Sequence, residues 1–382
     1  MKSRAYETLK QAYHCNIQNV IEWKNQGRYV VGCMGSDVPE EVLIAAGILP
    51  VYVFGQPKQD PILAKRYLEK GFDPYTLSQF EQVVTGQYKM LDRLIISNSS
   101  DAMIRTYYYL RAIRKMEPHM PVPPLYFFDF LHSPYRLSGV YNRDRLKAFI
   151  REVEGWTGQE ITKQMLYESI VLCNETRKLL HQLNALRQSP APKISGTQML
   201  ELIGALMVMP REQYKQYLSD LIKEANNHAV LQGVPVFVTG SPQDHTLFYE
   251  AVEGCGAIIT GEDHEMGFRH VKDLVDEKVD PIDGIVDRYH LRSPISAQAT
   301  VSRRVEDLLN EVKHSNAKAV IFYIHQKHDA ISWDYPSQRK ALEAQGIPVL
   351  LLENQPYGLI TDEVKEKLSE FINSVKGGQY VG

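Results

Sequence analysis

Residues 30–55 contain an apolar strand, a glycine-containing turn, a short helix and a second strand, and this unit constrains the fold more than any other stretch. Pro39 fixes φ for the first turn of the expected helix. Asp37 is positioned to cap that helix, and Gly47 to end it before a second strand begins at Pro50. The order strand, helix, strand predicts a βαβ unit with two parallel strands.

The same alternation recurs along the chain. Apolar runs followed by polar loops predict further strands at 91–96, 125–130, 235–238, 257–260, 317–324 and 348–352. Helical spacing predicts helices at 5–27, 102–115, 143–188, 246–253 and 197–229, the last broken near Pro210. We therefore expect an α/β fold with two parallel-sheet domains, Rossmann- or flavodoxin-like, and additional helices. The linker-like stretch 189–196 divides a domain at 1–195 from one at 196–382.

Size and charge narrow the class of protein. A chain of 382 residues is long enough for two domains. The net charge of −3 provides no basic field, which argues against nucleic acid as a partner. No apolar run reaches the ~20 residues that span a bilayer, and the first residues lack the apolar core of a secretion signal, so we expect a cytoplasmic protein without a membrane partner. The four cysteines form no CxxC pattern and are expected to be free thiols.

Polar loops follow most of the predicted strands. Because parallel strands place their carboxyl ends at one edge of a sheet, these loops are expected to meet in a cleft between the domains. The candidate catalytic residues are Ser36, Asp37, Ser100, Asp101, Glu265 and His328. The candidate substrate-binding residues are Asn98, Arg269, His325 and Trp333.

Several of these residues have simpler explanations. Ser100 and Asp101 can act as caps of the helix that follows them. Trp333 can belong to a packed loop, and two histidines three residues apart, His325 and His328, do not by themselves indicate a metal. The chain has no Walker or GxGxxG nucleotide motif, serine elbow or HExxH motif. The residues alone therefore predict a two-domain α/β protein with a polar interdomain cleft.

A set of short motifs, taken in order, resembles the 2-hydroxyacyl-CoA dehydratase and benzoyl-CoA reductase subunit family. One is Pro-Glu-Glu at 39–41, with Ala-Ala-Gly-Ile-Leu-Pro-Val at 45–51; others are Thr157-Gly158, Asn174 with Arg177, Val238 to Pro242, Asp263 with Gly267 and Arg269, Arg288-Tyr289, and Gly346 to Leu350. The resemblance implies an acyl-CoA substrate, a related sister subunit in a heterodimer, and an ATP-hydrolysing iron-sulfur activator. It also implies a [4Fe-4S] cluster held by three cysteines at strand ends, which supports radical dehydration or ring reduction in anaerobic metabolism.

The chain departs from this pattern at all three cluster positions, where Ser100, Glu265 and His328 stand instead of cysteine. These side chains are a poor ligand set for a cubane, and Cys33 with Cys255 would still leave a cluster short of thiolates. The sequence therefore predicts a cluster-less subunit whose sister chain carries the [4Fe-4S] cluster. Two alternatives stay open: a stand-alone acyl-CoA-binding or regulatory protein, and a metal-dependent enzyme using Ser100, Glu265 and His328.

Overall fold

The computed structural model describes residues 3–225, 228–291 and 299–378, and within them it contains two four-stranded parallel sheets. The first sheet has the order β2-β1-β3-β4, from β1 (Val30–Met34), β2 (Leu49–Tyr52), β3 (Arg93–Ser97) and β4 (Leu125–Phe128). The second has the order β6-β5-β7-β8, from β5 (Val234–Gly240), β6 (Ala257–Glu262), β7 (Ala319–His325) and β8 (Val349–Gln355). Each sheet thus places its strands in the flavodoxin-like order second, first, third, fourth. The predicted α/β fold with two parallel-sheet domains is confirmed.

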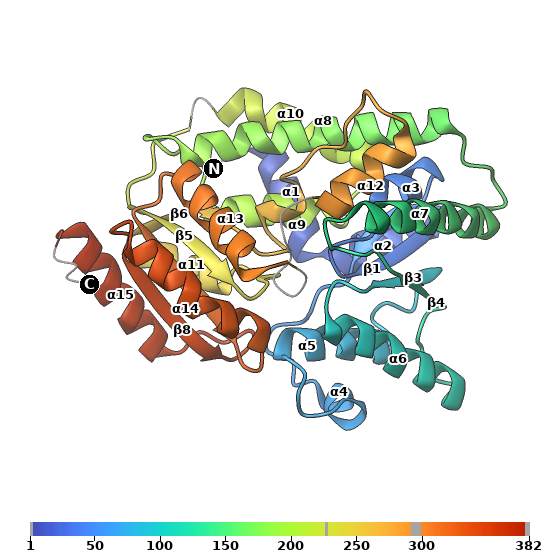
Figure 1. Cartoon of the computed structure of the whole chain (residues 1–382), viewed down its shortest axis with the longest axis horizontal. Helices are drawn as coiled ribbons and strands as arrows, with labels where there is room; N and C mark the ends of the chain where they lie inside the picture. Colours follow the sequence, from blue (N-terminus) through green and yellow to red (C-terminus); the bar gives the residue numbers. More distant parts are fainter. Residues whose placement is uncertain (1–2, 226–227, 292–298, 379–382) are drawn as a thin grey trace.

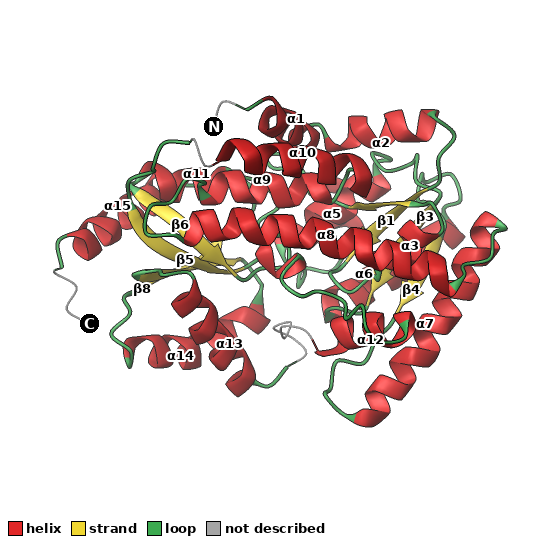
Figure 2. Cartoon of the chain, turned by 90° about the horizontal axis from the view of Figure 1, so that it is seen from above, coloured by secondary structure: helices red, strands yellow, loops and turns green. Residues whose placement is uncertain are grey.

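The sheets lie at opposite ends of the molecule, and the loops at their facing edges meet between them (Figure 2). The shorter helices are α3 (Glu40–Ala45), α4 (Ile62–Tyr67), α5 (Pro74–Val84) and α6 (Asp101–Met116) in the first half, and α11 (Leu247–Gly254), α12 (Pro281–Leu291), α13 (Val301–His314), α14 (Asp329–Glu343) and α15 (Asp362–Lys376) in the second. A 3-10 turn, η1 (Phe268–His270), follows β6.

Two predicted helices are divided in the structure. The helix expected at 5–27 is α1 (Arg4–His14) and α2 (Asn16–Asn25), which meet where Cys15 leaves helical geometry. The helix expected at 143–188 is α7 (Arg136–Thr157) and α8 (Lys163–Gln188). Gly158 ends α7 at φ 69°, a left-handed conformation that glycine adopts without steric cost.

Two local predictions are wrong. Asp37 does not cap α3: Pro39 stands at the N-cap position, and the Asp37 carboxylate instead accepts a hydrogen bond from Ser36. Trp333 does not lie in a packed loop, because α14 runs through it and through Pro336. Pro336 lies inside this helix, beyond its first turn, so the helix lacks the backbone hydrogen bond that an amide at this position would donate.

The long helix α8 runs across both halves of the molecule and contacts α3 in the first half and β6 in the second (Figure 1). Near its middle, the Arg177 guanidinium binds Glu40 of α3 at 2.8 Å. Close to its end, the Arg187 guanidinium donates to Glu262 of β6, with both side chains fully buried. Removing one partner from such a buried pair is strongly destabilising, so α8 holds the relative position of the two halves.

The helices α9 (Gly196–Leu206) and α10 (Arg211–Ala225) pack with α1 and α8. Most of their buried apolar side chains belong to the same hydrophobic cluster as the first sheet, whereas Leu200 of α9 belongs to one of the two clusters around the second sheet. The division at residue 195 stays a prediction. Among the described residues, no helix combines the length and apolar character required to cross a membrane.

Candidate functional site

A cavity of about 290 Å³ lies between the carboxyl edges of the two sheets. Its walls come from the loops after β3, β5, β6 and β7 and from the start of α5. In both sheets the strand order reverses beside the first strand, and open α/β sheets bind ligands at this switch point. The cavity brings together five sequence-predicted residues: Ser100, Asp101, Glu265, Arg269 and His328.

The wall from the first domain is formed by the start of α6. Ser100 is the N-cap of this helix, and its hydroxyl accepts a hydrogen bond from the Met103 amide at 3.2 Å. The exposed Asp101 carboxylate pairs with Arg105 at 2.7 Å, one turn further on. The capping role predicted for Ser100 is therefore confirmed, and its hydroxyl remains on the cavity wall.

The first turn of α5 forms a second part of this wall. Asp73 caps the helix by accepting from the Thr76 amide at 2.9 Å and from the Thr76 hydroxyl at 2.6 Å. Burial raises the pKa of the neighbouring Tyr75 hydroxyl well above its usual value. The phenol therefore stays protonated, and its oxygen accepts a hydrogen bond from Gln79 at 3.0 Å.

On the opposite wall, His328 is held by Ser241. The Ser241 hydroxyl oxygen lies 2.8 Å from Nδ1 of His328 and accepts the backbone amide of His325 at 2.9 Å. Because this oxygen already accepts from an amide, its own proton can be donated to Nδ1, a direction that corresponds to the Nε2–H tautomer of His328. Burial lowers the pKa of His328, against the opposing effect of Asp73, so the imidazole is neutral at neutral pH.

Three buried histidines, His245, His264 and His325, lie near the half-buried His328. We call these four residues the histidine wall. Burial lowers the pKa of His264 to about 3, and the pKa of His325 falls well below its usual value through burial and the other three histidines. His264 lines the cavity. Its Nε2 forms a hydrogen bond with the Tyr249 hydroxyl at 2.8 Å, whereas its Nδ1 has no hydrogen-bond partner among the described residues. The wall is thus polar, neutral and incompletely hydrogen-bonded.

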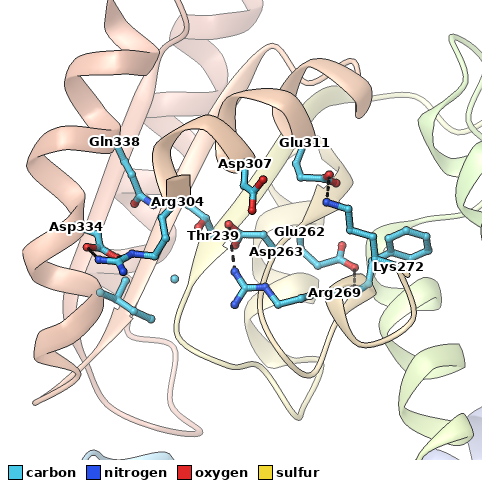
Figure 3. Close-up of a pocket in the computed structure, with 13 residues that line it drawn as sticks. Thr239, Glu262, Asp263, Arg269, Lys272, Arg304, Asp307, Glu311, Asp334 and Gln338 are labelled. Atoms are coloured by element: carbon cyan, nitrogen blue, oxygen red, sulfur yellow. Dashed lines mark hydrogen bonds and ion pairs between the residues drawn. The ribbon is translucent and has the colours of Figure 1, made fainter. Parts of the chain in front are cut away.

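A smaller cavity of about 60 Å³ adjoins the first and shares Arg269 with it (Figure 3). Here the guanidinium of Arg269 lies 3.8 Å from the Asp263 carboxylate, while Lys272 binds Glu311 at 2.5 Å and Arg304 pairs with Asp334. Burial raises the pKa of Asp263 despite this arginine. Arg269 is the loosely paired cation between the two cavities.

The remaining predicted site residues do not line the interdomain cavity. Ser36 and Asp37 are buried after β1, where Oδ2 of Asp37 lies 3.1 Å from Nε2 of His132. Asn98 joins the ends of β3 and β4 through two hydrogen bonds with the backbone of Phe130. His325 is buried behind His328, and Trp333 is 81% exposed on α14.

Sequence reasoning missed Asp73 and Tyr75 on the cavity wall and His132 beside Asp37. An aspartate directly before a proline, as at 73–74, is a helix-start pattern that could have placed α5. His132 follows a predicted strand, so the argument from strand ends applied to it as well. Which of these loops reach the cavity depends on the packing of the two sheets against each other, and the sequence gives no direct measure of that.

Among the residues that the structure describes, no cysteine lines the cavity. Cys33 and Cys173 are buried, and burial raises the pKa of both thiols. Cys255 lies in the turn before β6, at the amino end of that strand, and its thiol donates to the Lys365 carbonyl. Within residues 3–225, 228–291 and 299–378, the cavity lining therefore offers oxygen and imidazole ligands, a set that does not fit an iron-sulfur cubane.

In that same part of the chain, one group of three potential metal ligands lies close together: Glu40, Glu41 and Cys173. Arg177 binds both carboxylates, at 2.8 and 2.7 Å, and Arg211 binds the other oxygen of Glu40. Two guanidinium groups thus already neutralise these acids, so the cluster is a buried ion network.

These features define a class: two-domain α/β proteins whose paired parallel sheets hold a polar cavity between their carboxyl edges. The family model of 2-hydroxyglutaryl-CoA dehydratase, D-component, matches residues 35–375, and the chain belongs to this family.

Several curated relatives cover most of the chain at low identity. The (R)-phenyllactyl-CoA dehydratase beta subunit of Clostridium sporogenes is 24% identical, with 86% of each chain covered. The (R)-2-hydroxyglutaryl-CoA dehydratase beta subunit of Acidaminococcus fermentans is 24% identical, covering 86% of this chain and 88% of the relative. A benzoyl-CoA reductase subunit of Thauera aromatica is 23% identical, with 93% of each chain covered.

Proposed function

We propose that this chain is a cluster-less subunit of an acyl-CoA dehydratase or benzoyl-CoA reductase type complex. Family membership and the names of the relatives support the acyl-CoA chemistry. The observation that carries the proposal is the interdomain cavity, at which Ser100, Glu265 and His328 stand together where the family resemblance implies thiolates. Because these ligands do not suit a cubane, the [4Fe-4S] cluster is assigned to a partner chain.

The partner is a related sister subunit. Each of the three relatives is named as one subunit of its enzyme, which means that it works with other chains. A cluster-bearing sister would supply the electron-transfer chemistry, and an ATP-hydrolysing iron-sulfur activator would act on the assembled complex. This chain would contribute part of the substrate-binding surface.

Within the cavity, His328 is the group best arranged to move a proton. It is neutral at neutral pH and is oriented through Nδ1 by Ser241, which directs Nε2 away from that contact. Arg269 is loosely paired and can stabilise a negative charge that develops on a bound acyl group. The arrangement suits an uncharged thioester end with a polar acyl substituent.

The test is iron and acid-labile sulfide analysis, with a visible spectrum, on the chain purified anaerobically alone and then with its sister chain. We expect neither iron nor sulfide in the lone chain and both in the pair. Iron with sulfide in the lone chain would overturn the proposal, because the remaining cysteines would then have to be ligands.

A designed variant sharpens this test. Replacing Ser100, Glu265 and His328 together by cysteine places three thiols around the same cavity, and we expect the lone variant to take up a cluster on reconstitution. The matched control replaces the same residues by alanine and should take up none. Equal iron and sulfide content in the two variants would argue against the assignment of these positions.

Glu265 and His328 line the same cavity, and this also favours a second candidate, a metal-dependent enzyme. Carboxylate, imidazole and the Ser100 hydroxyl suit zinc or non-haem iron better than a cubane. Metal bound without sulfide, and lost from a Glu265→Ala, His328→Ala variant that keeps its fold, would select this candidate. A chain that binds acyl-CoA without a sister chain or a metal would select the stand-alone binding protein.

A further inference from the structure

A groove of about 410 Å³ opens beside the interdomain cavity, and we call it the lysine groove after Lys58, Lys65 and Lys327. The first turns of α5 separate the two spaces: Pro74 lines the groove, whereas Tyr75 lines the cavity. Lys327 lines both. The groove and the cavity are therefore neighbours, with one cation at their boundary.

The walls of the lysine groove are preformed by two interlocking loops, one after β2 and one after β8. The Gly55 amide donates to Oδ2 of Asp244 at 2.7 Å, and the Tyr357 hydroxyl donates to Oδ1 of the same carboxylate at 2.9 Å. At Gly358, a Cβ atom would lie only 2.8 Å from the Cα of Pro57. Because the loops touch this closely, the groove does not need to be formed by a ligand.

Charge distinguishes the groove from the cavity. The groove has three lysines and one acidic residue, Asp60, which pairs with Lys65. Neither Lys58 nor Lys327 forms an ion pair with any described residue. The cavity, in contrast, has four carboxylates against three cationic side chains: Asp73, Asp101, Glu265 and Asp329 against Arg105, Arg269 and Lys327. A polyanion is therefore favoured in the groove and disfavoured in the cavity.

The backbone at the two free lysines is also unusual. Lys58 has φ 71° and Lys327 has φ 60°, so both adopt the left-handed conformation that residues with a Cβ rarely occupy. Each follows the carboxyl end of a strand, β2 in one sheet and β7 in the other. Strain of this kind persists where the surrounding structure enforces it and is concentrated at ligand sites.

We propose that the lysine groove binds the phosphorylated nucleotide half of an acyl-CoA, with Lys58 and Lys327 contacting its phosphates. This inference rests on the proposed acyl-CoA function. A CoA thioester is strongly anionic at the nucleotide end and uncharged at the thioester, so it matches a positive groove that adjoins a negative cavity. Pro74 and Tyr357 supply apolar surface for the adenine, and the acyl end lies beside His328.

The test measures affinity by calorimetry on the full chain, alone and with its sister chain. The probes are free CoA, adenosine 3′,5′-bisphosphate, benzoyl-CoA and benzoyl-pantetheine. The variant is Lys58→Asn with Lys327→Asn, because asparagine tolerates the left-handed conformation and only the charges are lost. Lys340→Gln on α14, exposed and outside both spaces, is the matched control for the loss of a positive charge.

We expect the double variant to bind CoA, benzoyl-CoA and the bisphosphate roughly tenfold more weakly or worse, with a reduced salt dependence, because charge-assisted contacts are lost. Benzoyl-pantetheine binding and the control variant should match the wild type. If CoA and benzoyl-CoA bind the double variant as tightly as the wild type, the groove assignment is wrong while the proposed function stands. If the wild type binds neither compound with or without its sister, the proposed function fails as well.

Discussion

Two buried polar regions of this molecule use charge in opposite ways. In the ion network of Glu40, Glu41, Arg177 and Arg211, every carboxylate oxygen has a donor, the last being the Tyr289 hydroxyl at 3.0 Å from Glu41. The histidine wall, in contrast, contains ring nitrogens without hydrogen-bond partners among the described residues, in His245, His264 and His325. The carboxylates of this network have no acceptor oxygen left for a ligand, although Nε of Arg211 has no hydrogen-bond partner among the described residues. Unpaired ring nitrogens beside a cavity, in contrast, can still bind a ligand. The first region therefore holds the fold and the second serves the site.

The position of each region agrees with this division. The ion network joins α3 to α8 and to the start of α10. None of its four residues lines the interdomain cavity. The histidine wall lies at the carboxyl ends of β5, β6 and β7, where open parallel sheets place ligands. Burying incompletely paired polar groups costs stability, and such cost is characteristic of functional sites.

The largest effect should come from breaking the ion network. Arg177→Met leaves two buried carboxylates with reduced compensation, and we expect the free energy of unfolding to fall by about 3–5 kcal/mol. Urea denaturation measures this. Lys178→Met, the next residue on the same helix with a half-exposed ion pair to Glu277, is the control and should cost at most about 1 kcal/mol. Equal losses in the two variants would remove the distinction between the regions.

Acid should destabilise the two regions in separate pH windows. His264 has its pKa lowered to about 3 by burial, with Arg269 and Arg187 acting in the same direction. Between pH 3 and the pKa of about 6.5 that histidine has in the unfolded state, the unfolded state binds more protons than the folded state. The free energy of unfolding therefore falls as pH decreases, by up to about 1.4 kcal/mol per pH unit for this one group.

Glu40 contributes in a lower window. Despite the cost of burial, Arg211 and Arg177 hold its pKa well below the usual value. Its stabilisation is present above the unfolded pKa of about 4.3 and is lost as pH falls below it. Urea unfolding from pH 7 to 3 should therefore show losses that begin near pH 6 in the wild type. In His264→Leu the slope between pH 6 and 4.5 should be shallower; an unchanged slope would mean that this histidine is not the group that titrates.

A smaller effect is expected from Ser241→Ala, which removes one hydrogen bond from His328 and one from the His325 amide. We expect a loss of about 1–3 kcal/mol because the buried amide is left unsatisfied. Nitrogen-15 NMR should show the Nε2–H tautomer of His328 in the wild type and a mixture in the variant. Ser219→Ala, whose hydroxyl bonds a helix carbonyl of Lys215, is the control and should leave the tautomer unchanged. A wild-type spectrum with the proton on Nδ1 would reverse the assigned hydrogen-bond direction.

Sequence reasoning succeeded where a local pattern decides the outcome. Hydrophobic runs with turn residues at their ends located the strands, and the rule that parallel strands share an edge brought Ser100, Glu265 and His328 into one cavity. It was less successful where tertiary contacts decide. The Asp37 side chain takes Ser36 as its partner rather than capping α3, because Pro39 already begins the helix.

Long-range pairing explains the rest of what could not be predicted. The partners Arg177 and Glu40 are separated by 137 residues along the chain, so no local window contains both. The lysine groove is formed by loops from both domains, and its unusual backbone angles at Lys58 and Lys327 leave no compositional pattern. Burial of the histidine wall likewise depends on the packing of the second sheet.

The smallest effect should come from Trp333→Ala. The side chain is 81% exposed on α14, and we expect stability to change by less than about 0.5 kcal/mol, because little apolar surface is uncovered. Trp333 lines neither the interdomain cavity nor the lysine groove, so CoA affinity should match the wild type. Ile331→Ala, on the same helix and on the cavity wall, should weaken benzoyl-CoA binding in comparison. A loss of CoA affinity in the tryptophan variant alone would place the ligand over the outer face of α14, as the sequence-based assignment of Trp333 to substrate binding predicts. The functional region would then lie away from the histidine wall.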